Sequence, residues 1–300
     1  MTLFAKLRAG KLHSQGQRLS AAGDEEAALA AYRRALQLDP SRSSTAYNMG
    51  LIYKYRRAWA ESFQFNKLAG ELDSSDEATN WNLGIAATAL RDWATARAMW
   101  ARVGINVAGT EGPIEDNFGM TPVRLNADND DNREIEVVWA RRLCPARARI
   151  ANIPTAGTGF RYGDVVLHDG AAVGTRLTAQ GKERPVFNVL ELFEASQFST
   201  FEANIEAEDL EAVAALESIC DAKQLTMEDW TASLRNLCKA CSEGTPHDHH
   251  DTQQASTEWQ TARRIGLAAR EEAAARAALA EWGAPNDGRV LQNLQCVLRA

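Results

Sequence analysis

Small residues in the first third of the chain recur with a fixed period of 34 residues. A glycine stands at position 16 and again at two later positions, each 34 residues further on, and other small residues follow the same spacing. A period of this length predicts one helix–turn–helix unit per repeat, with neighbouring units stacked on one another. The positions that carry the period are Gly16, Gly50 and Gly84; Ala28, Ser62 and Ala96; and Ala35, Ala69 and Val103.

The first repeat illustrates how each unit is expected to fold. Gly23 lies in the tight turn between its two helices. Small Ala28 lets the two helices approach each other, and Tyr32 fills the space between them. Pro40 ends the second helix, because proline has no N–H and disfavours helical geometry in the residue before it.

These features resemble the tetratricopeptide repeat (TPR) family in three copies that share one register. Met49-Gly50 and Leu83-Gly84 take the close-packing position of the second and third copies, while Ser62 and Asn66 depart from the usual alanine and aromatic residue. The resemblance covers residues of about 10 to 104 and implies a superhelical α–α array of three repeats over residues 1–104. It also implies that the array holds another polypeptide and performs no chemistry of its own.

In the TPR family the first helix of each repeat lines a concave face. Large aromatic groups on that face are candidates to anchor a peptide, and Lys54 with Arg56 is a candidate to hold a carboxylate. The alternative is that Tyr47 and Trp81 pack against the neighbouring domain. The positions that match the concave face are His13, Gln17, Tyr47, Leu51, Lys54, Tyr55, Trp81, Ile85 and Thr88.

The segment after Val103 is rich in glycine and proline, so residues 105–122 are expected to form a linker. No capping helix follows the third repeat, although the last pair of an array normally needs one. The array is therefore expected to be docked on the following domain, which would act as its cap.

Residues 123–300 change to an alternating pattern and predict an α+β domain with a small, mainly antiparallel sheet. Strands are expected at 134–143 and in later runs separated by turns, and residues 165–176 are expected to form a hairpin with Asp169-Gly170 near its tip. A helix is predicted after Asp209, a long helix from Thr252 to Trp282, and a short helix near the end of the chain.

Charge divides unevenly along the chain, whose formal net charge is −7. Residues 1–104 carry +4 and the remainder −11. An acidic body beside the array disfavours nucleic acid as the main partner and would suit a basic protein. The sequence has no apolar run of 18 residues, and Met1–Arg8 is a short amphipathic lead-in, so neither a membrane span nor a signal peptide is expected.

Cysteine and histidine gather in residues 238–250, within a run that reads LCKACSEGTPHDHHD. Thiolate and imidazole are the preferred ligands of zinc, and a Cys-x-x-Cys pair presents two sulfurs to one metal. A closed Cys₂His₂ set of Cys238, Cys241, His247 and His250 would make a structural zinc site, with His249 able to replace either histidine. The alternatives are a polar histidine-rich loop and a redox Cys-x-x-Cys. The other cysteines, Cys144, Cys220 and Cys296, are expected to be buried apolar fillers.

No catalytic residue is assigned, because the sequence has neither a phosphate-binding glycine loop nor a nucleophile elbow. The leading hypothesis is a cytoplasmic protein-binding adaptor or inhibitor, such as a bacterial immunity protein that blocks a toxin. An odd number of cysteines in a chain of this size fits a reducing compartment. The alternative is a zinc-dependent hydrolase or transferase with its centre in the segment from Cys238 to His250.

Overall fold

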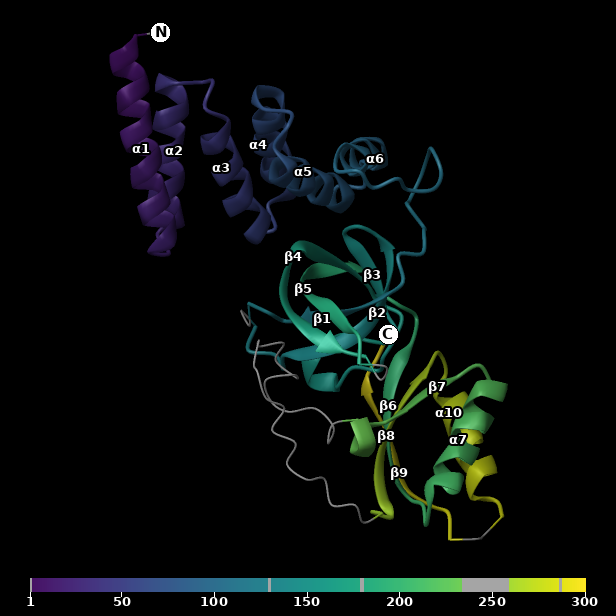
Figure 1. Ribbon diagram of the computed structural model, residues 1–300. Coiled ribbons are helices and arrows are strands. Elements are labelled where there is room, and N and C mark those ends of the chain that lie inside the picture. The colour runs from purple at the N-terminus through teal and green to yellow at the C-terminus, as the bar shows by residue number, and fades with distance from the viewer. Residues whose placement is uncertain (1, 129–130, 179–180, 234–258, 286–287) are drawn as a thin grey trace. The chain divides into compact units, whose positions relative to one another are not determined.

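The computed structural model describes residues 2–128, 131–178, 181–233, 259–285 and 288–300. The chain divides into two compact units. The first contains residues 1–116 with 144–146, and the second contains residues 117–143 with 147–300. Figure 1 shows that the first unit is helical and the second combines strands with helices. The expected α+β class with a TPR-type array is confirmed.

The first unit contains six helices that follow one another as three antiparallel hairpins (Figure 1). Each helix contacts the next along the chain, and α3 also contacts α5, so the hairpins stack in sequence. This is the architecture of a three-repeat TPR array. The helices are α1 (Leu3–Ala21), α2 (Glu25–Leu38), α3 (Ser43–Tyr55), α4 (Trp59–Leu72), α5 (Glu77–Ala89) and α6 (Trp93–Arg102).

The periodic glycines bring the two helices of each hairpin close together. A methyl group on any of the three would overlap a side chain of the second helix: the ring of Tyr32 at Gly16, the amide of Asn66 at Gly50, and the ring of Trp100 at Gly84. The partner stands 16 residues after its glycine in every repeat. Glycine is therefore required here for the close approach of two helices.

The departures of the second repeat from the family pattern form a hydrogen-bonded pair. Ser62 Oγ donates to the backbone oxygen of Gly50 at 2.9 Å, and Asn66 Nδ2 donates to the backbone oxygen of Ser62 at 2.8 Å. Ser62 and Asn66 are both buried. A buried polar group is tolerated when it is hydrogen-bonded, so these contacts replace the aromatic packing of the other two repeats.

The turn inside each hairpin also repeats with the period of 34. Gly23, Arg57 and Arg91 all have positive φ, at 82°, 58° and 60°. The residue that follows each of them donates its backbone N–H to a carbonyl five residues earlier, which closes the first helix of the hairpin. The left-handed conformation costs a residue with a Cβ atom about 1 kcal/mol or more, so the two arginines are strained where Gly23 is not.

The second unit begins with a closed barrel of five strands. β1 with β2, β3 with β4, and β4 with β5 pair in antiparallel fashion, whereas β1 and β5 pair in parallel and close the barrel. The interior is apolar and includes Val123, Val138, Ile150 and Val166. The strands are β1 (Met120–Leu125), β2 (Glu136–Cys144), β3 (Arg147–Ile150), β4 (Val165–Leu177) and β5 (Glu183–Glu194), and a short 3₁₀ helix, η1 (Ala156–Thr158), lies between β3 and β4.

The hairpin predicted with its tip at Asp169-Gly170 is wrong, because both residues lie within the single long strand β4. The register of β4 against β5 shifts several times between Val165 and Gly174, which marks bulges. Asp169 Oδ1 accepts the N–H of Gly170 at 2.7 Å. An Asp-Gly pair with such a local bond is typical of turns, which is why the sequence predicts a turn, but here the strand continues through it. The chain reverses after β4, where Thr178 N donates to Lys182 O at 2.8 Å.

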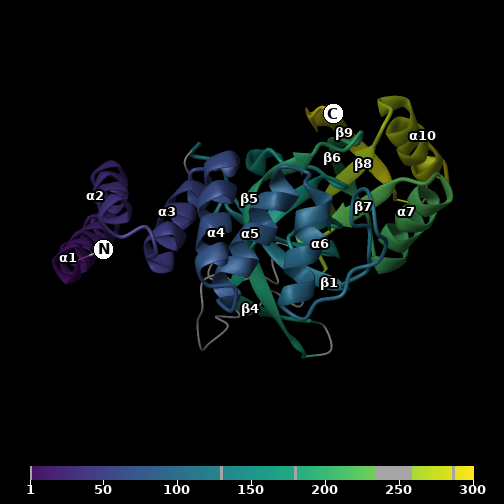
Figure 2. The same cartoon turned by 90° about the horizontal axis from the view of Figure 1, so that it is seen from above.

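A second, four-stranded sheet follows in the order β7-β8-β6-β9, with antiparallel neighbours throughout. Together with α7 and α10 this gives the β-α-β-β-α-β connection of a ferredoxin-like fold. Both helices lie on one face of the sheet, as Figure 1 and Figure 2 show, and bury Leu216, Leu279 and Trp282 against it. The elements are β6 (Ser199–Glu206), α7 (Leu210–Ala222), β7 (Thr226–Asp229), α8 (Trp230–Ser233), β8 (Ala262–Ala269), α10 (Glu272–Gly283) and β9 (Val290–Leu298).

The prediction of one long helix from Thr252 to Trp282 is wrong where β8 lies. It is confirmed over the later part, which forms α10. The short helix expected at the end of the chain is also wrong, because β9 occupies that segment. Both strands pair with β6 over most of its length. Alanine, arginine and leucine favour helices locally, but tertiary pairing with β6 overrides that preference.

Buried polar contacts join the barrel to the second sheet. The carboxylate of Glu228 in β7 accepts the N–H of Ile153 at 2.9 Å and the side-chain amide of Asn152 at 3.1 Å. Trp230 Nε1 donates to Ile153 O at 3.0 Å. Burial raises the pKa of Glu228, while these hydrogen bonds oppose that shift. The junction is therefore specific, since one carboxylate satisfies two donors of the barrel.

Relief of the strained turns provides a first test of this fold. Arg57→Gly and Arg91→Gly should each raise the free energy of unfolding by about 1 kcal/mol, because glycine adopts positive φ without steric cost. Urea unfolding followed by helical circular dichroism measures the change. The matched control is Arg34→Gly in the exposed interior of α2, which should destabilise by about 1 kcal/mol. Destabilisation by either turn variant would contradict the described backbone.

His168 provides a second test, through pH. Burial and the nearby Arg142 guanidinium lower the pKa of this fully buried imidazole to about 4, and its Nδ1–H donates to the backbone oxygen of Asp169 at 2.8 Å. As pH falls below 6.5, the imidazole of His168 becomes protonated in the unfolded chain, whereas in the folded state it stays neutral until about pH 4. Stability should therefore fall as pH falls through this window, by up to about 3 kcal/mol.

Replacement of the imidazole isolates its contribution to that pH dependence. In His168→Gln the free energy of unfolding should fall less steeply between pH 6.5 and pH 4 than in the unmodified chain. Urea midpoints of the second unit at several pH values measure both slopes. An imidazole of His168 that titrates near pH 6.5 in a nuclear magnetic resonance experiment would refute the buried, neutral assignment.

Candidate functional site on the helical array

The first helix carries cations without acidic neighbours of its own. α1 contains Lys6, Arg8, Lys11 and Arg18 and has no aspartate or glutamate. None of these four side chains makes an ion pair with another described residue. α3 also has no acidic residue, but its cation Lys54 is hydrogen-bonded to Asn82 of α5. The charge of α1 is therefore available to a ligand.

A hollow of about 700 Å³ lies along α1. Cationic side chains and one histidine surround it, and none of its lining residues carries a carboxylate. Its apolar lining residues include Leu12 and Leu7, of which Leu7 is 60% exposed. The lining residues are Lys6, Leu7, Gly10, Lys11, Leu12, His13, Ser14, Gln15, Arg18 and Arg42.

His13 lies in this hollow and links the first two repeats. Its Nδ1 lies 2.9 Å from Thr45 Oγ1 of α3, and its ring centre is 5.7 Å from that of Tyr32. Burial, and secondarily the positive charge of Arg42, lowers the pKa of His13. At neutral pH the imidazole is therefore uncharged, and it serves the hollow as a hydrogen-bonding group.

Arg42 is held at the edge of the hollow by Asp39. Its guanidinium lies 3.8 Å from the Asp39 carboxylate, which also accepts the hydroxyl of Ser41 at 2.7 Å. The hydrogen bonds from Ser41 and the charge of Arg42 lower the pKa of Asp39 against the opposing effect of burial. The same turn recurs 34 residues later, where Asp73 accepts the hydroxyl of Ser75 at 2.7 Å. Arg42 is therefore positioned by a structural feature of the repeat.

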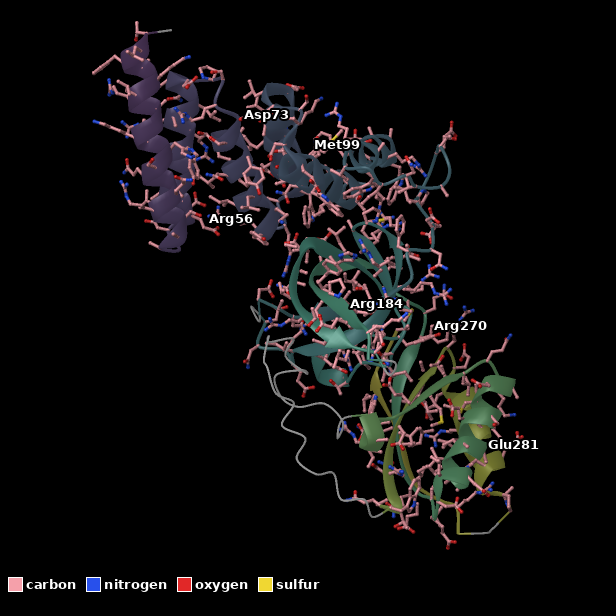
Figure 3. All side chains as sticks on the ribbon, in the orientation of Figure 1. Arg56, Asp73, Met99, Arg184, Arg270 and Glu281 are labelled. Atoms are coloured by element: carbon pink, nitrogen blue, oxygen red, sulfur yellow. The ribbon has the colours of Figure 1, made fainter. Side chains whose placement is uncertain are left out.

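The two cations expected to hold a carboxylate are engaged within the array. Lys54 Nζ donates to Asn82 Oδ1 of α5 at 3.1 Å and lies 4.5 Å from the ring centre of Tyr55. Arg56 donates to Glu25 and Glu26 of α2, and Figure 3 shows it at the end of α3. Both side chains thus connect one repeat with the next.

The remaining predicted binding residues differ in their accessibility. Gln17 is exposed and Tyr55 is 54% exposed, whereas Tyr47 and Leu51 are half-buried. Trp81 is half-buried with its ring edge-on to Trp100 at 5.1 Å. Ile85 and Thr88 are buried, and the Thr88 hydroxyl donates to Gly84 O at 2.7 Å. The assignment of these residues to a partner stays a prediction.

Four lining cations, Lys6, Lys11, Arg18 and Arg42, were not among the predicted binding residues. The sequence signal for three of them is the absence of acidic residues over the 19 residues of α1. Arg42 has no such signal, because the turn after α2 brings it to the hollow. Its contact with α1 depends on the folded hairpin.

The predicted zinc ligands Cys238, Cys241, His247 and His250 lie outside the described residues. Within the part of the chain that the structure describes, no group of three or more potential ligands is close enough to hold a metal ion. Cys144 and Cys220 are buried as predicted, and Cys296 is half-buried. Burial raises the pKa of Cys220 to about 12, so this thiol is unreactive. None of the described helices is long and apolar enough to cross a membrane.

No protein-family model and no curated protein matches this sequence. Solved structures similar to about a third of the chain include the second and first TPR domains of Spaghetti (RPAP3), each bound to the HSP90 peptide SRMEEVD. Both are 22% identical with a TM-score of 0.31, and the match covers 85% and 78% of their chains. The N-terminal domain of stress-induced protein-1 from C. elegans is 23% identical over 34% of this chain and 86% of its own, with a TM-score of 0.32.

Proposed function

We propose that this chain is a protein-binding adaptor whose helical array takes up an acidic segment of a partner along α1. The observation that carries the proposal is the hollow of about 700 Å³ lined by Lys6, Lys11, Arg18 and Arg42 without a carboxylate. Clustered cations attract acidic groups and accelerate association with them. A stacked array presents such a surface ready-formed, so little ordering is needed when a peptide binds.

Apolar side chains beside the cations indicate the second feature of the partner. Leu3, Phe4 and Leu7 are 75%, 68% and 60% exposed and lie within the first turns of α1. Burial of such side chains supplies affinity, while the charges supply orientation. We therefore expect a partner segment that combines acidic residues with at least one large apolar residue.

Affinity capture with charge-reversed variants tests this proposal. The full chain is immobilised, and partners from the native host are identified by mass spectrometry after capture. Lys6→Glu with Lys11→Glu should reduce capture of the specific partner at least tenfold, because acidic groups would then be repelled. The same partner should dissociate faster as salt concentration rises. Limited proteolysis of the complex identifies the protected segment, which should be acidic.

The matched control changes the net charge equally on other helices. Arg34→Glu with Lys67→Glu alters two exposed cations of α2 and α4 that lie outside the hollow. This control should retain the partner. Equal losses in both double variants, or a protected segment without acidic residues, would refute the site on α1.

The finer form of the proposal is a specific inhibitor, such as an immunity protein that blocks a toxin. The uneven charge of the chain supports it, because the part after residue 104 carries −11 and suits a basic surface on the same partner, separate from its acidic segment. The captured partner would then lose its own activity when bound. A partner that stays fully active in the complex would favour a plain adaptor.

We further propose that the segment from Cys238 to His250 binds zinc, on the strength of its ligand types and spacing. Purified chain should hold one zinc ion per molecule by mass spectrometry of metals, and Cys238→Ser or His250→Ala should release it. Loss of stability together with zinc would support a structural site. Zinc that exchanges freely while the fold persists would favour the alternative, a zinc-dependent hydrolase or transferase. Retention of zinc by both variants would exclude these ligands.

A further inference from the structure

A second hollow, of about 600 Å³, lies within the second unit and combines arginines with aromatic side chains. Strand pairing sets a row of outward-facing residues across the barrel, since Arg149 is paired with Val165 and Val165 with Glu194. The connection from β5 to β6 and the end of β8 enclose this row. The lining residues are Arg141, Arg149, Ile150, Ala151, Tyr162, Gly163, Val165, Glu194, Ala195, Ser196, Gln197, Phe198 and Arg270.

Two of the arginines come from neighbouring strands. β2 and β3 are neighbours in the barrel, and Arg141 of β2 and Arg149 of β3 both line the hollow. Arg141 makes no ion pair with another described residue, so its charge is available to an anion in the hollow.

The third arginine stands against an aromatic wall. Arg270, labelled in Figure 3, follows β8 directly. Its guanidinium lies 5.4 Å from the ring centre of Phe198. Phe198 and Tyr162 meet nearly at right angles with ring centres 5.2 Å apart. Within the described chain Arg270 has no ion pair, so its charge also faces the hollow unneutralised.

The wall is fixed before any ligand arrives. Phe198 and Tyr162 pack against buried Trp230 at the junction of the barrel and the second sheet. Buried Asp164 accepts the N–H of Ser196 at 2.7 Å and the N–H of Arg161 at 2.8 Å, which holds the connection before β6. A site whose walls are held in this way loses little entropy when a ligand binds.

From this geometry we propose that the hollow binds a small phosphate ester that carries a planar ring, a molecule of the nucleotide class. Guanidinium groups bind phosphate oxygens in pairs, and a planar ring can stack on aromatic or guanidinium planes. The volume lies in the range of small-molecule sites. Glu194, the only carboxylate of the described lining, would accept hydrogen bonds from hydroxyl or amino groups of the ligand.

The ligand is a small molecule rather than a nucleic acid strand. Residues after 104 carry −11, which would repel an extended phosphate backbone but permits one or two phosphates among three arginines. This site shares no residue with the hollow on α1.

Isothermal titration calorimetry of the full chain tests the site with AMP, ADP, ATP and inorganic phosphate at constant ionic strength. We expect at least one nucleotide to bind with a Kd below about 1 mM, and phosphate to bind at least tenfold more weakly because it lacks the ring. Arg141→Gln with Arg149→Gln should weaken nucleotide binding at least tenfold. Arg270→Lys keeps the charge but removes the planar fork, and should weaken it several-fold.

Two controls separate the site from general charge. Arg184→Gln alters an exposed arginine of β5 outside the hollow and should leave binding unchanged (Figure 3). Glu194→Gln keeps an oxygen that accepts the hydrogen bonds of the ligand but removes the negative charge, so binding of ATP should strengthen more than binding of AMP. Thermal unfolding confirms that each variant remains folded. The proposal is overturned if no nucleotide gives a signal at 1 mM, if phosphate binds as tightly as the nucleotides, or if Arg184→Gln weakens binding as much as the double variant.

Discussion

The close approach of two helices at one glycine per repeat is the constraint on which the helical unit depends. At Gly16, Gly50 and Gly84 the space of a missing side chain is filled by a residue 16 positions later. That residue is a tyrosine, an asparagine or a tryptophan, so different chemistries fill the same space. The constraint acts on the backbone and explains why the glycines keep the period strictly while their partners vary.

The distribution of ion pairs follows from this stacking. Where hairpins meet, cations such as Lys54 and Arg56 connect one repeat with the next and are therefore engaged in contacts within the array. The cations of α1 make no ion pair with another described residue, and Leu3, Phe4 and Leu7 on the same helix are exposed. Charge and apolar surface that the stacking does not use therefore occur together on α1, where the proposed peptide site lies.

The second unit obtains its binding surface in a different way. Its barrel and its ferredoxin-like sheet each bury an apolar core, and a half-buried carboxylate, Glu228, joins them through backbone and side-chain donors. The same junction fixes Phe198 and Tyr162 beside a row of arginines. The hollow therefore exists because two separately folded layers meet in one defined way, and neither layer contains it alone.

The helical array could be predicted from the sequence alone, because its period, its glycines and its turn residues are local signals that recur in each repeat. The sequence also indicated most strands of the second unit, and it placed α7 correctly after Asp209. It failed at β8 and β9, where helix-favouring residues become strands, because pairing with β6 is a contact between residues far apart in the chain. The prediction of a hairpin tip at Asp169 was wrong. The Asp-Gly pair forms a local hydrogen bond that is typical of turns, but pairing with β5 keeps β4 extended on both sides of it. The sequence indicated part of the site on α1, because it shows a helix without acidic residues there. The place of Arg42 beside α1 and the row of arginines on the barrel could be seen only in the tertiary structure. The sequence shows where the charged residues are, but which of them line a common hollow depends on which chain segments meet.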